Sequence, residues 1–326
     1  MHKNKFIKGF IKVSTALAGL LLILFFSFRN SDIDAETLKE RYTDSQSQFI
    51  SIDGLEVHFK DEGTGFPIVL IHGTSASLHT WDAWTKKLIE NYRVIRMDLP
   101  AFGLTGANKN NTYDLESYNQ FLESFMEKVG VSEFALAGNS LGGSIAWHYA
   151  SNHQKQVKQL VLVDPGGFPS NKGKPFVFKL AEMPIVNQLL KHITPKSFIR
   201  NNLEQVYYDD SKITSELVER YHQMILREGS RDAFIERSKI AFKDETALLE
   251  KINTPTLILW GENDIWIPVE NGLKFDAKLS KSRLVIMKET GHIPMEERPE
   301  ESLAHLLDFL NEYQTETSDT QEKESS

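Results

Sequence analysis

Three residues whose side chains can cooperate in nucleophilic catalysis occur in the order Ser140, Asp264 and His292. A serine hydroxyl is too weakly acidic to attack a carbonyl carbon unaided. It needs a basic histidine within hydrogen-bond distance, and the histidine needs a carboxylate that fixes its tautomer. Each of the three residues lies just past an apolar run typical of a buried strand. We therefore predict a catalytic triad with Ser140 as nucleophile, Asp264 as acid and His292 as base.

The Gly-x-Ser-x-Gly run around Ser140 predicts a sharp turn between a strand and a helix. Such a turn leaves little room beside the serine, and Gly138 and Gly142 meet that requirement. The helix behind the turn would present unpaired N–H groups to a developing anion. We predict an oxyanion hole made by the N–H of Leu141, directly after the nucleophile, and by the N–H of Thr74 in the His-Gly-Thr turn after another strand.

The apolar patterns predict an α/β fold with a mostly parallel central sheet, flanking helices and an inserted helical cap. Strand and helix patterns alternate over residues 47–167, and long crossovers of this kind join parallel strands. Only helical patterns occur over residues 168–250, which we interpret as a cap over the carboxyl edge of the sheet. Strand patterns resume over residues 251–313, so the acid and the base should reach the same edge as the nucleophile.

Residues 1–30 differ in kind from the rest of the chain. Four lysines within the first 12 residues precede an uncharged run over 13–28 that is rich in Leu, Phe and Ala. This pattern predicts an uncleaved membrane anchor. The alternative, a secreted protein with a cleaved signal, needs small residues after the run, where Ser, Phe, Arg and Asn stand at 27–30. The lysines would stay in the cytoplasm, which puts the catalytic domain on the extracytoplasmic side.

Two polar segments flank the predicted α/β core. We interpret residues 31–46 as a tether between the anchor and the core, and residues 314–326 as a disordered tail. Two histidines are assigned no part in catalysis. His58 lies in an alternating strand, where we expect it to face solvent, and His72 is expected to have a structural role in the turn that holds Thr74.

Composition excludes several classes of function. The net charge of −8 argues against a general nucleic-acid binder, because binding to phosphates needs clustered Lys and Arg. The absence of cysteine excludes disulfides, thiolate metal sites and cysteine nucleophiles. Glycine-rich runs such as Gly63-Thr64-Gly65 lack the spacing of phosphate or dinucleotide loops, and no histidine pair has metal-ligand spacing. We expect neither a cofactor nor a metal.

Five motifs in order together resemble the α/β-hydrolase fold superfamily over about residues 48–313. They are His72-Gly73-Thr74-Ser75, Asp98-Leu99-Pro100-Ala101-Phe102-Gly103, Gly138-Asn139-Ser140-Leu141-Gly142-Gly143, Gly261-Glu262-Asn263-Asp264 and Gly291-His292. The resemblance implies the same triad and a cap over roughly residues 168–250. Asp164 is an alternative acid because some relatives use that strand end, and Glu262 is a weaker one. The Gly-Glu-Asn-Asp turn favours Asp264.

We expect a serine hydrolase that cleaves carboxylic esters through an acyl-enzyme on Ser140, with a small-molecule ester as substrate. Apolar cap residues are candidates to line an acyl pocket or to pack the cap onto the sheet: Phe176, Phe178, Met183, Ile185, Leu189 and Leu190. The Asn-Ser-Leu-Gly-Gly run is also similar to serine hydrolases that cleave carbon–carbon bonds of ring-fission products. A membrane-tethered binding module on a hydrolase scaffold that has lost its activity is a third interpretation.

Overall fold

The computed structural model describes residues 15, 19, 26–169 and 173–324. The membrane anchor predicted for residues 1–30 lies largely outside these residues. Within the described ranges, no helix combines the length and the apolar character needed to cross a bilayer.

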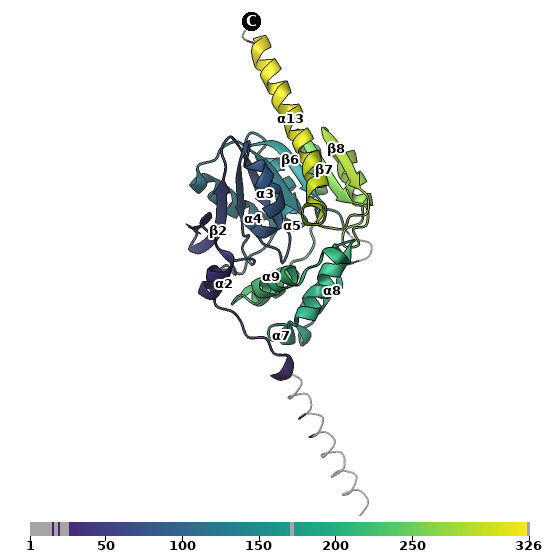
Figure 1. Ribbon diagram of the computed structural model, residues 1–326. Helices are drawn as coiled ribbons and strands as arrows, with labels where there is room; N and C mark the ends of the chain where they lie inside the picture. The colour runs from purple at the N-terminus through teal and green to yellow at the C-terminus, as the bar shows by residue number, and fades with distance from the viewer. Residues whose placement is uncertain (1–14, 16–18, 20–25, 170–172, 325–326) are drawn as a thin grey trace, which may run out of the picture.

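One eight-stranded sheet forms the centre of the molecule, in the order β1-β2-β4-β3-β5-β6-β7-β8 (Figure 1). From β4 through β8 all neighbouring strands are parallel, whereas β1 and β2 pair antiparallel at one edge. This confirms the predicted fold class. The strands are β1 (Ser47–Ile52), β2 (Leu55–Glu62), β3 (Phe66–Ile71), β4 (Tyr92–Met97), β5 (Phe134–Asn139), β6 (Val157–Val163), β7 (Thr256–Gly261) and β8 (Ser282–Met287).

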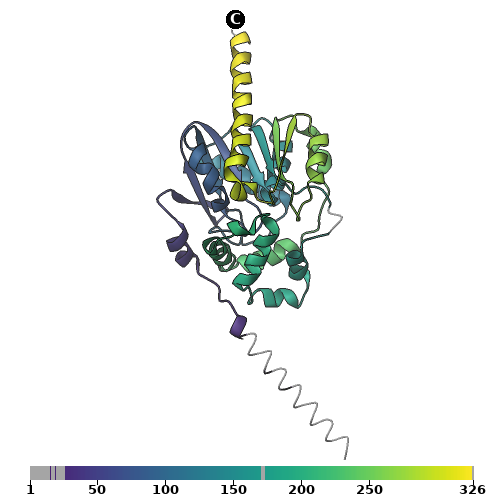
Figure 2. The same cartoon turned by 45° about the vertical axis from the view of Figure 1, so that its right-hand side comes forward.

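Helices cover both faces of the sheet because its central strands are apolar on both sides. Val69 and Leu136 point into one cluster with α4 and α5, and Leu70 and Ala137 into another with α3 and α13. Figure 2 shows this layering. The covering helices are η1 (Leu78–Trp81), α3 (Asp82–Leu88), α4 (Leu115–Val129), α5 (Leu141–Asn152), α11 (Glu270–Lys278), α12 (Pro294–Glu297) and α13 (Pro299–Glu324).

The segment between β6 and β7 is helical and lies at the carboxyl ends of the parallel strands, below the sheet in Figures 1 and 2. It forms the cap that the sequence pattern predicts. Its elements are α6 (Phe176–Glu182), α7 (Val186–Leu190), α8 (Lys196–Val206), η2 (Asp210–Lys212), α9 (Ser215–Ile225) and α10 (Ser230–Ser238). The last helical turn before β7, η3 (Thr246–Lys251), packs against α5 and α11 instead.

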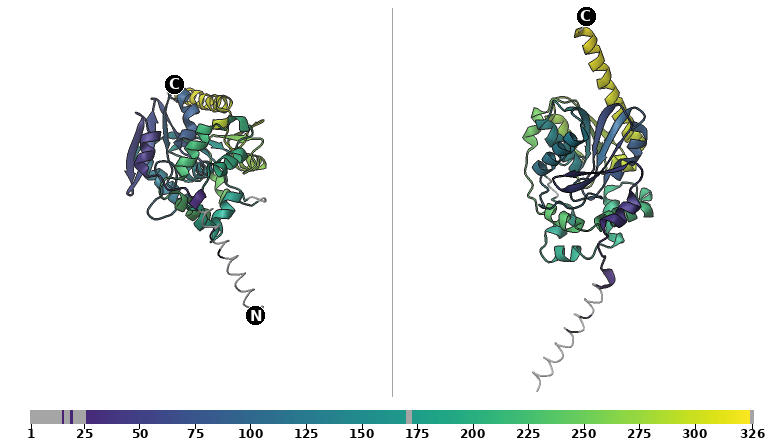
Figure 3. Two further views of the ribbon diagram at one scale, coloured as in Figure 1. Left: turned by 60° about the horizontal axis from the view of Figure 1, so that its bottom comes forward. Right: turned by 90° about the vertical axis from the view of Figure 1, so that its left-hand side faces the viewer.

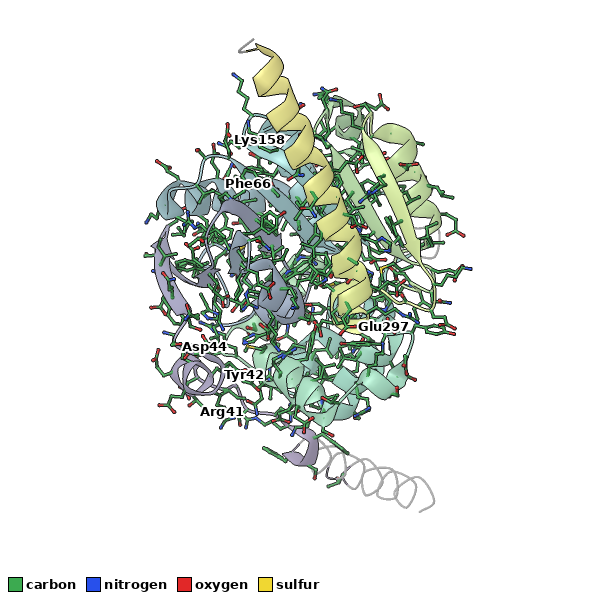
Figure 4. The ribbon with its side chains drawn as sticks, turned by 45° about the horizontal axis from the view of Figure 1, so that its top comes forward. Arg41, Tyr42, Asp44, Phe66, Lys158 and Glu297 are labelled. Atoms are coloured by element: carbon green, nitrogen blue, oxygen red, sulfur yellow. The ribbon has the colours of Figure 1, made fainter. Side chains whose placement is uncertain are left out.

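The segment expected to be a polar tether contacts both the cap and strand β2, where Lys39 pairs with Glu56 and Asp44 with Lys60. The Ile33 N–H donates to the Leu226 carbonyl at 2.8 Å, and the Ile33 carbonyl accepts from the Glu228 N–H at 3.0 Å. Helix α2 (Ala35–Tyr42) follows, and the Tyr42 hydroxyl donates to Gln223 of the cap. The right-hand view of Figure 3 shows α2 beside the cap, and Figure 4 labels Tyr42.

Two details differ from the sequence-based expectations. Helix α13 continues to Glu324 and projects from the body, where we expected a disordered tail from residue 314 (Figures 1 and 2). The segment contains no Gly or Pro after Pro299 and is rich in Glu and Gln, which favour helix. The prediction that His58 faces solvent is wrong: it is fully buried, and its Nδ1–H donates to the Asp98 carboxylate at 2.8 Å.

Candidate active site

Ser140 lies at the junction of β5 and α5 with φ 53° and ψ −111°, a strained conformation for a residue with a side chain. The turn is held from both sides, because the Ser140 N–H donates to the Val163 carbonyl and the Ser140 carbonyl accepts from the Gly166 N–H. A Cβ on Gly138 would lie 2.2 Å from the Gly142 carbonyl oxygen. Position 138 therefore has no room for a side chain, and only glycine fits there.

His292 and Asp264 form the hydrogen-bonded pair that the triad requires. The His292 Nδ1–H donates to Asp264 Oδ2 at 2.6 Å, and both residues are buried. The other oxygen, Oδ1, accepts the N–H groups of Trp266 at 2.8 Å and Ile267 at 2.9 Å. Three donors thus hold this carboxylate in place and stabilise its negative charge. The pair fixes Nε2 of His292 as the nitrogen available to accept a proton.

Nε2 of His292 is buried and has no hydrogen-bond partner among the described residues, and His292 lines the same pocket as Ser140. The serine hydroxyl therefore does not hydrogen-bond to the imidazole in this structure. Hydrogen bonds of this kind often form only when substrate is bound. The structure brings all three predicted triad residues to one edge of the sheet.

The two predicted oxyanion donors lie on either side of Ser140. Leu141 is the first residue of α5, so its N–H has no acceptor within that helix. Thr74 lines the pocket with Ser140, in the turn after β3. A Cβ added to Gly73 would lie 3.2 Å from the Cβ of Ser140, which shows how closely this turn passes the nucleophile.

His72 has the structural role predicted for it. Its Nδ1–H donates to the Gly73 carbonyl at 2.7 Å, and its Nε2 accepts the Leu99 N–H at 2.9 Å. One nitrogen donates and the other accepts, so the ring is neutral. Burial lowers the pKa of His72, which agrees with this state. The ring fixes the turn that carries Thr74.

Asn139, directly before the nucleophile, joins the nucleophile strand to the histidine loop. Its side-chain amide donates to the carbonyls of His292 at 3.0 Å and Val163 at 3.1 Å. The His292 N–H in turn donates to the Val206 carbonyl at the end of cap helix α8. The sequence placed Asn139 in a motif but gave no sign that its partner lies 153 positions away.

Two acidic residues of α12, which follows His292, connect the cap to the loop that carries His292. Glu297, labelled in Figure 4, accepts the N–H groups of Tyr208 and Asp209 from the cap and that of Gly291. Glu296 accepts the hydroxyls of Tyr207 at 3.0 Å and Tyr221 at 2.7 Å. Sequence reasoning missed both residues, because consecutive glutamates at the start of a helix are usually a solvated helix end.

The two alternative acids lie in different environments. Glu262 is exposed, and no contact brings it to His292 within the described residues. Asp164 is fully buried at the end of β6, and its Oδ1 accepts the Gly261 N–H at 2.9 Å. Burial, together with the charge of Asp264, raises the pKa of Asp164 well above its ordinary value. A protonated carboxyl cannot stabilise an imidazolium as a carboxylate does.

Asp164, Asp264 and His292 also have the one spacing among the described residues that would suit a metal, with one donor atom from each within 4.8 Å of the others. The donor set does not favour a cation, because the Asp264 carboxylate already accepts three N–H groups and Nδ1 of His292 is a donor. The geometry is that of a hydrogen-bonded imidazole–carboxylate pair with a neighbouring carboxyl.

A largely apolar pocket extends from Ser140 and His292 into the cap. Its walls come from the cap helices and from the loop after β7: Phe178, Leu190, Phe198, Leu203, Phe234 and Trp266. Of the six apolar cap residues singled out from the sequence, Phe178 and Leu190 line this pocket. The others are exposed instead of packed against the sheet, with exposed fractions of 66% for Phe176, 50% for Met183, 81% for Ile185 and 46% for Leu189.

One cationic side chain lines this pocket. Arg231, near the start of α10, is 6% exposed, and its Nη2 donates to the Asp32 carboxylate at 2.6 Å and to the Asn30 carbonyl at 3.0 Å. Its Nε and Nη1 are buried without a partner among the described residues, as is the hydroxyl of Ser230 next to it. The cap wall therefore combines an apolar lining with unsatisfied hydrogen-bond donors.

The chain is similar in sequence to a family of known proteins. Residues 67–299 match the family model of the alpha/beta hydrolase fold. An uncharacterized hydrolase of Bacillus subtilis (strain 168) is 28% identical over 264 residues, which cover 80% of this chain and 96% of that protein. A 2-hydroxy-6-oxononadienedioate/2-hydroxy-6-oxononatrienedioate hydrolase of Pseudomonas putida is 28% identical over 268 residues, which cover 78% and 92% respectively.

A solved structure extends the similarity over most of the chain. The crystal structure of a membrane phospholipase A, a bacterial virulence factor, is 27% identical, with a TM-score of 0.73. The match covers 94% of this chain and 98% of that one. Hydrolases of more than one bond type therefore share the architecture.

Proposed function

Because this chain belongs to the α/β-hydrolase fold family, we propose that it is a serine hydrolase that cleaves carboxylic esters through an acyl-enzyme on Ser140. The observation that carries the proposal is the His292–Asp264 hydrogen bond of 2.6 Å beside a serine on a strained strand-to-helix turn. This combination supplies a nucleophile and an oriented base at the mouth of one apolar pocket.

The reaction steps follow from the roles open to Ser140 Oγ and His292 Nε2. Nε2 of His292 takes the proton of the Ser140 hydroxyl as Oγ attacks the ester carbonyl carbon, and Asp264 stabilises the imidazolium. The N–H groups of Leu141 and Thr74 stabilise the oxyanion, each worth about 3 to 4 kcal/mol. The imidazolium then protonates the departing alcohol. Water activated by Nε2 hydrolyses the acyl-enzyme and regenerates the serine.

The apolar walls of the pocket favour an apolar acyl group. Transfer of acyl methylenes from water to this lining stabilises the bound substrate by about 0.8 kcal/mol for each CH₂ that is buried. Similarity to a membrane phospholipase A supports acyl esters as the substrate class.

A turnover series tests the proposal. The full chain is assayed on p-nitrophenyl esters from acetate to palmitate, with Ser140→Ala as control, and is labelled with a fluorophosphonate probe. We expect turnover that rises with acyl length, and neither turnover nor labelling in Ser140→Ala. Labelling without turnover of any ester would contradict ester hydrolysis. Absence of labelling in the folded protein would favour a binding module that has lost its activity.

Carbon–carbon bond hydrolysis is a second candidate, favoured by the similarity to the Pseudomonas putida hydrolase. The substrates in that protein's name are dicarboxylates, and a carboxylate needs cationic or N–H donors. The unpaired Nε and Nη1 of Arg231 would meet that need in this pocket. Turnover of a vinylogous diketone acid, with no turnover of esters, would favour this alternative.

We also propose that the protein is anchored in a membrane through its N-terminal apolar run, with the catalytic domain on the extracytoplasmic side. The lysine-rich start and the uncharged run over 13–28 support this proposal. The exposed apolar residues of α6 and α7 lie in the cap close to where this segment meets the body, since the Asn30 N–H donates to the His192 carbonyl just after α7. A mass measurement of the mature protein would reveal whether the segment is retained.

A further inference from the structure

The ester-hydrolysis mechanism gives no role to the carboxyl of Asp164, which is buried close to the site. It follows β6 with φ 43°, in the left-handed region, and none of its surface is exposed. Its Oδ1 accepts the Gly261 N–H. Its Oδ2 is buried and receives no N–H or hydroxyl hydrogen bond among the described residues.

The carboxyl of Asp164 lies beside the catalytic pair. One of its oxygens, one oxygen of Asp264 and a ring nitrogen of His292 lie within 4.8 Å of one another. Two carboxyl groups this close and shielded from water cannot both be ionised, since the like charges repel strongly and neither is solvated. One of the two must hold a proton.

The hydrogen-bond donors around each carboxyl decide which one is protonated. Asp264 accepts from Trp266 N–H, Ile267 N–H and the imidazole of His292, which together stabilise an anion. Asp164 accepts one N–H, and its second oxygen receives none. The negative charge therefore belongs on Asp264 and the proton on Oδ2 of Asp164.

We propose that Asp164 is a neutral carboxylic acid whose Oδ2–H donates a hydrogen bond to the Asp264 carboxylate, which makes it a positioning residue for the Asp264–His292 pair. Its role in turnover rests on the ester-hydrolase function proposed above. The protonated state is supported by the pKa of Asp164, which burial and the charge of Asp264 raise well above the ordinary value.

The other charged group that acts on Asp164 is Glu297, whose effect has the same sign. The Glu297 carboxylate accepts the N–H groups of Tyr208, Asp209 and Gly291, and its charge disfavours a second charge at Asp164. At alkaline pH, loss of the Asp164 proton would remove the hydrogen bond to Asp264 and add a repelling charge beside it. Activity should therefore fall as Asp164 ionises.

The variant that tests this is Asp164→Asn in the full chain, because the amide keeps the shape and can donate to Asp264 but cannot ionise. We expect its kcat/KM to stay within about threefold of the parent at neutral pH, with the alkaline fall in activity removed. Asp164→Ala, which loses the donor, should lower kcat up to about 100-fold with KM little changed. Asp264→Asn should lose about 10⁴-fold.

A second readout does not depend on catalysis. Infrared difference spectra between the parent and Asp164→Asn should show the carbonyl stretch of a buried protonated carboxylic acid at neutral pH, present only in the parent. The absence of that band, or an Asp164→Asn variant as inactive as Asp264→Asn, would overturn the inference. If no ester is hydrolysed by the parent but the band is present, the proposed substrate is wrong while the protonated Asp164 stands.

Discussion

At the scale of single residues, the strain at Ser140 is held by close backbone packing on both sides of it. A Cβ on Gly138 would meet the carbonyl of Gly142, and a Cβ on Gly142 would lie 2.2 Å from the carbonyl oxygen of Ile71. Strand β5, helix α5 and the end of β3 thus approach one another so closely that no side chain fits between them. The position of the nucleophile depends on these contacts more than on any side-chain interaction of the serine.

Gly138→Ala should therefore impair both folding and catalysis. The added methyl must displace α5, which costs about 1 to 3 kcal/mol of unfolding free energy, and the shift at Ser140 should lower kcat about 100-fold. Gly130→Ala is the matched control: its φ is +70° but nothing lies within 4 Å of the new Cβ. It should lose only about 1 kcal/mol and keep its kcat. Urea unfolding measures the stability of the two variants and an ester assay measures their kcat. Equal stability and equal kcat in the two variants would contradict the role given to Gly138.

Asp98 provides a pH-dependent contribution to stability. Its carboxylate accepts the N–H groups of Leu78 and Leu104 and the Nδ1–H of His58. Burial alone would raise the pKa of Asp98, but the charge and hydrogen bond of His58 hold it well below the ordinary 3.8. A lowered folded-state pKa stabilises the protein above 3.8, and this contribution is lost as the pH falls from there toward the folded-state pKa.

Asp98→Asn should therefore destabilise the protein at neutral pH by about 3 to 5 kcal/mol, because a buried pair loses its anion. The difference from the parent should shrink as the pH is lowered below 3.8, where the parent begins to lose the same interaction. Urea unfolding of both proteins at neutral and acid pH measures this. A difference that stays constant with pH would show that the Asp98 charge is not the source of the stability.

At the scale of elements, the sequence predicted most of what local patterns determine. Apolar runs located the strands around Ser140, Asp264 and His292, and the interruption of the strand pattern located the cap. Contacts between distant side chains that lie outside the recognised motif pattern of the triad were not predictable. The alternation of apolar and polar residues around His58 is typical of a strand with one face in solvent. Its partner Asp98 follows β4, and the two residues meet because β2 and β4 are neighbours in the sheet. The Tyr207 and Tyr221 contacts to Glu296 are of the same kind.

The N-terminal end of α10 gives a test of charge recognition in the pocket. Arg231→Met should leave the turnover of a neutral ester within about threefold of the parent. For the same ester with a terminal carboxylate on its acyl chain, the variant should raise KM by about ten- to 100-fold. This factor corresponds to the loss of one charge-assisted hydrogen bond, about 1.5 to 3 kcal/mol. Asp32→Asn is the control, because it removes the ion pair of 2.6 Å and keeps the guanidinium. If Arg231→Met changes KM equally for the neutral and the carboxylate ester, Arg231 does not recognise the substrate carboxylate.

At the scale of the whole molecule, the cap brings together the pocket, the N-terminal segment and an exposed apolar surface. Asn30 and Ile33 bond to cap residues, and the described residues just before them, Phe26 and Phe28, are 66% and 54% exposed. Ile185 and Met183 are exposed on the cap itself. In Figures 1 and 2 the described residues from 26 to 33 lie beside the cap, at the end of the molecule opposite the projecting end of α13. A membrane at this end would face the cap.

If the exposed cap residues contact lipid, charge placed there should impair action on lipid substrates alone. The double variant Ile185→Glu, Met183→Glu should lower the rate of phospholipid-vesicle hydrolysis about tenfold or more, because two carboxylates resist transfer from water into the bilayer interface. Its turnover of a soluble p-nitrophenyl ester should stay unchanged. Leu273→Glu on α11 is the matched control, since Leu273 is also exposed, at 55%, but flanks the sheet away from the cap. A ratio of vesicle to soluble activity that is the same in both variants would show that this surface does not meet the membrane.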